Sequence, residues 1–251
     1  MSQSALNALS PLDGRYVNKT STLQQFFSES ALIKYRLHVE IEYFIALCKS
    51  SIYQLKKFPD KKNSDLRKIY SQFSIDDAKR IKEIEKKINH DVKAVEYFIK
   101  EKFDELKLSE FKEFIHFGLT SQDINNTAIP YSIKEGLNTV YLPYIEKIIK
   151  LLKEKSQDWE NVSMLARTHG QAASPTKVGK EIFVFIERIE KQILLLNNIP
   201  INAKFGGATG NFNAHYLAYP KIDWVSFAKN FTEERLGLDY SFPTTQIEHY
   251  D

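Results

Sequence analysis

Cysteine is nearly absent from this chain, and its absence excludes two kinds of site. Cys48 is the single cysteine among 251 residues, so no disulfide can form within the chain and a metal site built on cysteines is not expected. The six histidines offer no substitute, since no two stand at helical ligand spacing and no His-Glu-x-x-His motif occurs. The sequence therefore predicts neither a metal nor a cofactor.

An excess of one charge and a long apolar run are missing as well. The 35 basic and 32 acidic residues are largely interleaved and leave a net charge of +3, too balanced for a protein that neutralises many phosphates. No apolar run approaches the roughly 20 residues that span a bilayer, and residues 1–12 lack a basic segment followed by an apolar core. We expect a cytoplasmic protein with no nucleic-acid partner and no membrane partner.

Glycine and proline are scarce, which favours helices over a sheet-rich fold with many turns. Only 9 glycines and 8 prolines occur. Apolar residues recur at spacings of three and four over residues 22–49, 74–103 with a bend at 89–91, 120–159, 174–197 and 223–236. We expect an all-α fold with a bundle of long helices. A domain boundary near residue 110 would separate an N-terminal helical domain, 1–110, from the first part of a central bundle, 111–251.

Helix-start signals precede several of these segments. Ser74 and Asp77 have the spacing of a capping box, and Thr120 with Asp123 repeats the arrangement. Asp223 opens a shorter helix. These residues predict where three helices begin.

Prolines and the last long helix carry further expectations. Pro130 and Pro143 should kink or split the segment 120–159. Ser174 should cap a helix to about Asn197, with Pro175 in its first turn. Some apolar residues of that helix lie off its main face, which favours packing on several sides, as in an oligomer: Phe183, Leu194 and Leu195.

The polar breaks between helices hold most of the histidines. Four of the six lie in or beside such breaks: His90, His116, His169 and His215. Residues 89–91, 120–121 and 168–174 sit at expected helix starts, where free N–H groups and the helix dipole favour anions. A small anionic substrate held there would need no metal.

Each of these polar pieces also has a structural explanation. Residues 167–171, Arg-Thr-His-Gly-Gln, could aim the imidazole of His169 at a substrate, or could be a turn that contains a histidine. Asn89 to Asp91 and Thr120-Ser121 could be caps and no more. His116, between two apolar residues, fits a satisfied semi-buried histidine better than a catalyst.

Two glycine-containing loops complete the candidates. Residues 206–210 lack the strand context and spacing of a dinucleotide-binding loop. Residues 10–16, Ser-Pro-Leu-Asp-Gly-Arg-Tyr, form a turn in which Arg15 beside Tyr16 could clamp a phosphate.

Six motifs occur together and in order: Ser10-Pro-Leu-Asp-Gly-Arg-Tyr16, Asn89-His-Asp-Val-Lys-Ala-Val-Glu96, Thr120-Ser-Gln-Asp-Ile-Asn-Asn126, Arg167-Thr-His-Gly-Gln171, Gly207-Ala-Thr-Gly-Asn-Phe-Asn-Ala-His215 and Thr244-Thr-Gln-Ile-Glu248. From about residue 5 to the end, the chain resembles the bacterial-type adenylosuccinate lyases of the fumarase/aspartase superfamily. The resemblance implies a homotetramer with active sites shared between chains. It also implies β-elimination of fumarate from adenylosuccinate, giving AMP, and from the succinylated aminoimidazole carboxamide ribonucleotide of purine synthesis.

The resemblance also implies roles for individual residues. His169 would be the general acid that protonates the leaving nitrogen, with His90 orienting or binding the substrate. The other implied contacts are Arg15 and Tyr16 on the phosphate, Asn89 and Asp91 lining the site, Thr120 and Ser121 on the succinyl carboxylate, and Gln246 on the substrate.

One family signature is missing from these residues. The mobile Gly-Ser-Ser-x-Met-Pro loop that carries the serine base does not occur, so we expect an N-terminal portion that is inactive alone. Two alternatives stay open: another lyase of the superfamily, such as argininosuccinate lyase or fumarase, and a non-catalytic helical scaffold.

Overall fold

The computed structural model describes residues 7–249. It divides into two compact units, the first formed by Met1–Glu135 with Ile201–Asp251 and the second by Gly136–Pro200. Helices dominate both units, which confirms the all-α fold class. These two units do not test the expected domain boundary near residue 110. That boundary stays a prediction.

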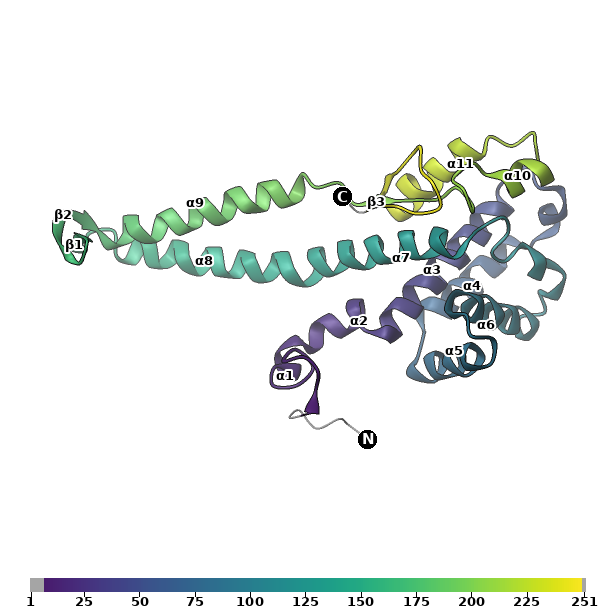
Figure 1. Cartoon of the computed structure of the whole chain (residues 1–251), viewed down its shortest axis with the longest axis horizontal. Helices are drawn as coiled ribbons and strands as arrows, with labels where there is room; N and C mark the ends of the chain where they lie inside the picture. The colour runs from purple at the N-terminus through teal and green to yellow at the C-terminus, as the bar shows by residue number, and fades with distance from the viewer. Residues whose placement is uncertain (1–6, 250–251) are drawn as a thin grey trace. The chain divides into compact units, whose positions relative to one another are not determined.

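The first unit is built around α3, Glu29–Cys48, which is buried on nearly every side. Among the helices that follow α3 in the chain, α4, α5 and α6 pack against it (Figure 1). The α-helices of this unit are α1 Val17–Thr20, α2 Gln24–Phe27, α3, α4 Asn63–Ser71, α5 Ile75–Ile88, α6 Asp91–Glu105, α7 Ser121–Gly136, α10 Asn213–Ala218 and α11 Trp224–Asn230. Two short strands, β3 Asn202–Ala203 and β4 Asp239–Tyr240, pair in parallel.

The expected helix starts in this unit are confirmed. The Ser74 hydroxyl accepts from the Asp77 N–H at 3.2 Å, and the Asp77 carboxylate accepts from the Ser74 N–H at 2.9 Å, a complete capping box. At the start of α7 the Asp123 carboxylate accepts from the Thr120 N–H at 2.8 Å. Asp223 caps α11 by accepting from the Ser226 N–H at 3.0 Å.

Aromatic side chains fill the core between α3 and the C-terminal segment. The ring of Tyr43 lies 5.1 Å from that of Phe205 and 5.9 Å from that of Phe231. The ring of Phe227 lies 6.0 Å from that of Tyr43 and 5.3 Å from that of the fully buried Trp224. Such tilted and edge-on aromatic pairs stabilise a core beyond the area they bury. The C-terminal segment is therefore held on α3 by packing between residues distant in sequence.

The second unit is a pair of long helices joined by a hairpin. Figure 1 shows α8, Leu142–Asp158, and α9, Val178–Asn197, running side by side, with the strands β1, Ser163–Thr168, and β2, Gln171–Lys177, between them in the chain. The strands are antiparallel, and Thr168 pairs with Gln171. His169 and Gly170 form the turn with φ of 49° and 76°, the positive values that a tight hairpin turn requires at both central residues.

The hairpin corrects one expectation. Ser174 and Pro175 do not begin a helix but lie in β2, and α9 starts at Val178. The Ser-Pro signal is local, whereas residues 171–177 find a strand partner across the hairpin, where Pro175 lies opposite Leu165 beside a bulge. Proline is tolerated at such an irregular position because no ladder hydrogen bond from its nitrogen is needed.

The two prolines of the predicted segment 120–159 behave differently. Pro130 lies inside α7, which is assigned as one unbroken helix. A π-helical turn, Leu137–Tyr141, separates α7 from α8, and Pro143 occupies the first turn of α8. The helical segment is therefore irregular only beside the second proline, where a π-helical turn replaces regular α-helical hydrogen bonding.

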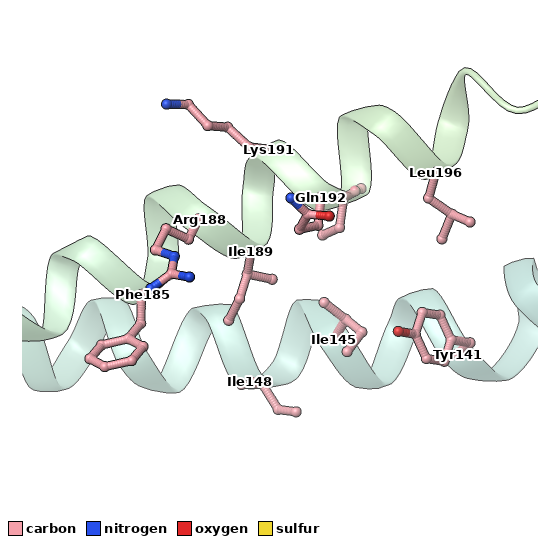
Figure 2. Close-up of a pocket in the computed structure, with 10 residues that line it drawn as sticks. Tyr141, Ile145, Ile148, Phe185, Arg188, Ile189, Lys191, Gln192 and Leu196 are labelled. Carbon is pink, nitrogen blue, oxygen red and sulfur yellow. The ribbon is translucent and has the colours of Figure 1, made fainter.

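The second unit leaves much apolar surface exposed. Phe183, Leu194 and Leu195 are 52%, 62% and 59% exposed, as their off-face positions predicted. A groove of about 710 Å³ runs between the helices, where Ile145 of α8 and Ile189 of α9 point toward one another (Figure 2). Among residues 7–249, no helix has the length and apolar character that crossing a bilayer requires.

Truncation of the central helix should destabilise the first unit. Leu37 of α3 is completely buried, so Leu37→Ala should lower the free energy of unfolding by about 2–5 kcal/mol, through lost burial and the cavity left behind. Urea unfolding followed by circular dichroism measures it. The control is Leu217→Ala on α10, where the side chain is 88% exposed and the change should stay within about 0.5 kcal/mol. Equal effects would contradict the central place of α3.

Candidate active site

His90 lies in the break between α5 and α6, held by its own helix. Asn89 ends α5 in the left-handed conformation with φ of 55°. His90 is then the N-cap of α6, and its Nδ1 accepts from the Lys93 N–H at 3.1 Å. Residues 89–91 therefore do contain a helix cap, and the imidazole of His90 supplies it. Because Nδ1 accepts, neutral His90 carries its proton on Nε2.

The start of α7 meets this break. The Ser121 hydroxyl lies 3.3 Å from His90 Nε2, and Thr120 directly precedes it. The structure thus brings together residues 89–91 and 120–121, which are separate in sequence. Two helix N-termini meet at one surface position, where the partial positive charges of both favour an anion.

Arg36 of α3 holds both helix starts, although it was not identified from the sequence; its place in an apolar helix was the only available signal. Its Nη2 donates to the Asp91 carboxylate at 2.7 Å, and its Nε donates to Asn125 Oδ1 of α7 at 2.9 Å. Only 7% of its side chain is exposed. Partial burial opposes ionisation of Asp91, but Arg36 and the Val92 N–H outweigh it and lower the pKa of Asp91.

A second buried charge pair lies under α7. The ammonium of Lys204 is 2.7 Å from the Asp123 carboxylate, and both side chains are completely buried. The same carboxylate accepts from the N–H groups of Gly206, at 2.9 Å, and Gly207, at 3.1 and 3.2 Å. The sequence identified Asp123 only as a cap and did not identify Lys204. A lysine two residues before a glycine pair was the available signal, but its partner is 81 residues away.

The segment that carries Gln246 packs on the glycine loop. Gly210 has φ of 78°, and a Cβ there would lie 2.1 Å from the Thr244 carbonyl oxygen, so no larger residue fits. Two residues beyond Gln246, the Glu248 N–H donates to Asn126 Oδ1 of α7 at 3.1 Å. Gln246 itself is exposed. The segment is therefore tied to the same helix as Thr120 and Ser121.

Two other histidines are structural groups, one semi-buried and one buried. His116 Nδ1 lies 2.5 Å from the buried Glu40 carboxylate, which confirms the expectation of a satisfied, semi-buried histidine. Burial opposes its charge, but Glu40 outweighs burial and raises the pKa of His116. His215 Nε2 lies 3.0 Å from the Tyr43 hydroxyl. Burial lowers the pKa of His215 to about 4, so it is neutral near neutral pH.

The two remaining predicted pieces belong to other segments of the chain. Arg15 stands over the ring of Tyr16 at 5.3 Å in the turn of residues 10–16, and both side chains are exposed. Within residues 7–249 neither side chain makes a hydrogen bond or ion pair with His90, Asp91 or Ser121. His169 belongs to the second unit, where the hairpin turn exposes its imidazole. These positions leave the proposed roles of Arg15, Tyr16 and His169 as predictions.

Comparison with known proteins assigns the family. A family described as "Lyase" matches residues 14–246, nearly the whole chain. The chain belongs to this lyase family. It is 55% identical to adenylosuccinate lyase of Dictyostelium discoideum over 98% of its length, and 46% identical to that of Vibrio cholerae over all of it. It covers 54% and 56% of those two proteins, so it spans about half the length of the curated relatives.

Solved structures show the same fold at low sequence identity. A fumarate lyase from a Mesorhizobium species is similar with a TM-score of 0.70 and 19% identity, over 89% of this chain and 49% of that one. A β-carboxy-cis,cis-muconate cycloisomerase from Acinetobacter calcoaceticus reaches a TM-score of 0.67 at 17% identity, over 89% of this chain and 50% of that one. Both support the helical architecture of the family.

The lowered pKa of His215 predicts an acid-side loss of stability. The unfolded chain binds a proton at an ordinary histidine pKa and the folded chain only near pKa 4. The unfolded state therefore gains stability as the pH falls below about 6.5, and about 2 kcal/mol of folding free energy should be lost between about pH 7 and about pH 5. Urea unfolding of wild type and His215→Gln at both pH values measures this loss as a difference. His116, whose pKa shifts in the opposite direction, is present in both proteins, so its contribution to the pH dependence cancels in the difference. Equal pH dependence in the two would contradict the burial argument.

Proposed function

We propose that this chain forms part of an adenylosuccinate lyase, which eliminates fumarate from adenylosuccinate and leaves AMP. The same chemistry would cleave the succinylated aminoimidazole carboxamide ribonucleotide of purine synthesis. The observation that carries the proposal is the 55% identity to a relative of that name over nearly the whole chain. The meeting of residues 89–91 with 120–121 supports it, because a dianionic succinyl group suits a place where two helix N-termini converge.

In the proposed reaction the carbon–nitrogen bond of the succinyl group breaks. A base removes the proton from the adjacent carbon, the electron pair forms the double bond of fumarate, and the bond electrons leave with nitrogen. His169 gives that nitrogen a proton as general acid. The group that takes the carbon-bound proton is not among the residues proposed here. His90, with Nε2 carrying the hydrogen, would donate to and orient the substrate.

The remaining predicted residues would hold the ends of the substrate. The fork of Arg15 beside Tyr16 suits the nucleotide phosphate, since a guanidinium matches phosphate oxygens. The hydroxyls of Thr120 and Ser121 would bind a succinyl carboxylate. Further substrate contacts are proposed for Asn89, Asp91 and Gln246.

We also propose that the protein acts in the cytoplasm as a homotetramer with active sites shared between chains. The exposed apolar side chains of α8 and α9 support such an assembly, because an isolated helix pair would leave them in water. The interleaved surface charge supports small-molecule substrates rather than a nucleic acid or a membrane.

Substrate choice tests the proposed function directly. The product of the complete gene should release fumarate from adenylosuccinate, and should act far more slowly on argininosuccinate or malate. Chromatographic quantification of fumarate or of the amine product measures all three reactions under one set of conditions. Preference for argininosuccinate or malate would place the protein elsewhere in the superfamily. A folded protein without any of the three activities would favour the non-catalytic scaffold.

Replacement of His169 tests the proposed acid. In the same full-length protein, His169→Gln should lower kcat by about a hundred- to ten-thousand-fold, the usual contribution of a positioned acid or base, with a smaller change in KM. Steady-state kinetics with adenylosuccinate measures both constants. Lys180→Gln in the first turn of α9 is the control, since its side chain is 60% exposed and it should keep wild-type kcat. Normal turnover by the His169 variant would rule out the assigned role.

A further inference from the structure

The Asp123 carboxylate accepts more hydrogen bonds than a helix cap requires. Its Oδ2 accepts from the Thr120 N–H, as a cap does. Its Oδ1 accepts from Lys204 at 2.7 Å and from the Gly206 N–H at 2.9 Å, and both oxygens lie near the Gly207 N–H. A capping aspartate at the surface would be solvated, but this one is completely buried with its cation.

The ammonium group of Lys204 also has two buried hydrogen-bond acceptors. Its ammonium donates to Asp123 and to the Gly207 carbonyl oxygen at 2.5 Å. It therefore balances the charge of the Asp123 carboxylate and ties the residue before the glycine loop to Gly207 within the loop. A buried charge without a partner is strongly unfavourable, so the two side chains must be buried together. The pair thereby fixes the loop of residues 206–210 on the first turn of α7.

The glycine loop in turn packs against a segment that is distant in the sequence. Gly210 donates its N–H to the Gly207 carbonyl oxygen at 3.3 Å and leaves no space for a Cβ against the Thr244 carbonyl oxygen. The chain from Thr244 to Glu248 thus packs directly on the loop. Asn126, one turn along α7 from Asp123, accepts from the Glu248 N–H and donates to the Glu248 carbonyl oxygen at 3.4 Å.

We propose that Asp123 and Lys204 are positioning residues, whose buried pair sets Thr120 and Ser121 in register with the segment that carries Gln246. The proposal rests on the proposed function in one respect, that these residues contact one substrate. Neither Asp123 nor Lys204 reaches the surface, so neither touches that substrate itself. They act by fixing the distance between two groups of binding residues.

The test removes both charges together. Asp123→Asn alone would leave the Lys204 ammonium buried without a counter-charge, whereas Asp123→Asn with Lys204→Met leaves no buried charge behind. The matched control is Lys153→Met with Glu190→Gln, which removes an ion pair whose side chains are 50% and 48% exposed. Native-state hydrogen exchange by NMR is the readout, with amides of α5 as internal reference.

The Glu248 amide is the decisive reporter, because its own acceptor, Asn126, is unchanged in the variant. Positioning through the loop predicts that its protection falls roughly tenfold or more in the buried-pair variant, but not in the control, while α5 is unaffected. Loss confined to Gly206 and Gly207, or uniform loss throughout the unit, would mean a purely structural role and would overturn the proposal.

Two further measurements complete the test. In the unaltered protein, a through-hydrogen-bond coupling should join the Gly206 amide nitrogen to the Asp123 carboxylate carbon; its absence would overturn the proposal even if the variant does not fold. In the full-length protein, the variant should raise KM for adenylosuccinate about tenfold with little change in kcat, since substrate-binding groups are displaced. An unchanged KM would count against it. If wild type does not cleave adenylosuccinate, the proposed function fails, and hydrogen exchange still decides the positioning.

Discussion

One polar stripe on a buried helix organises the first unit. Arg36, Glu40 and Tyr43 of α3 are spaced by four and three residues, so they share one face. Arg36 bonds Asp91 and Asn125, Glu40 bonds His116, and the Tyr43 hydroxyl donates to the Phe117 carbonyl oxygen at 2.7 Å beside His215. Because α3 is buried, each of these groups needs a partner. Asp91, His116 and Phe117 lie in the breaks between other helices, and Asn125 lies near the start of α7. The requirement to satisfy buried polar groups thus gathers those breaks along one line.

The helices and their starts were predictable because their causes are local. Ser74 and Asp77 act within one turn, and the apolar spacing of residues 22–49 reports the burial of α3 directly. Ser174 and Pro175 show the limit of the same reasoning. Their helix-start signal is genuine as a local preference, but pairing of residues 171–177 with residues 163–168 outweighs it. Strand pairing depends on a second segment, which no window of a few residues contains.

The candidate site divides in the same way. Polar composition and motif order identified His90, Thr120, Ser121 and Asp91, and the structure brings these four together in the first unit. Arg36 and Lys204 were not identified from the sequence, because neither lies in a polar break. Arg36 is embedded in an apolar helix, and Lys204 precedes a glycine loop. Their partners, Asp91 and Asp123, are 55 and 81 residues away. A charged residue in an apolar segment indicates that a counter-charge exists, but not where it lies.

The caps at the two helix starts bear on how an anion would be recognised there. The Lys93 N–H is already bonded to His90, the Val92 N–H to Asp91 at 2.8 Å, and the Thr120 N–H to Asp123. These amides are therefore unavailable to a ligand, although the dipoles of α6 and α7 still favour negative charge. Direct contacts must come instead from side chains that the caps leave pointing outward, above all the Ser121 hydroxyl and His90 Nε2. Recognition by side chains can be aimed at a particular arrangement of carboxylates, provided that the elements carrying them are held rigidly. The buried pairs of Arg36 with Asp91 and of Lys204 with Asp123 supply that rigidity beneath the surface on which the substrate would lie.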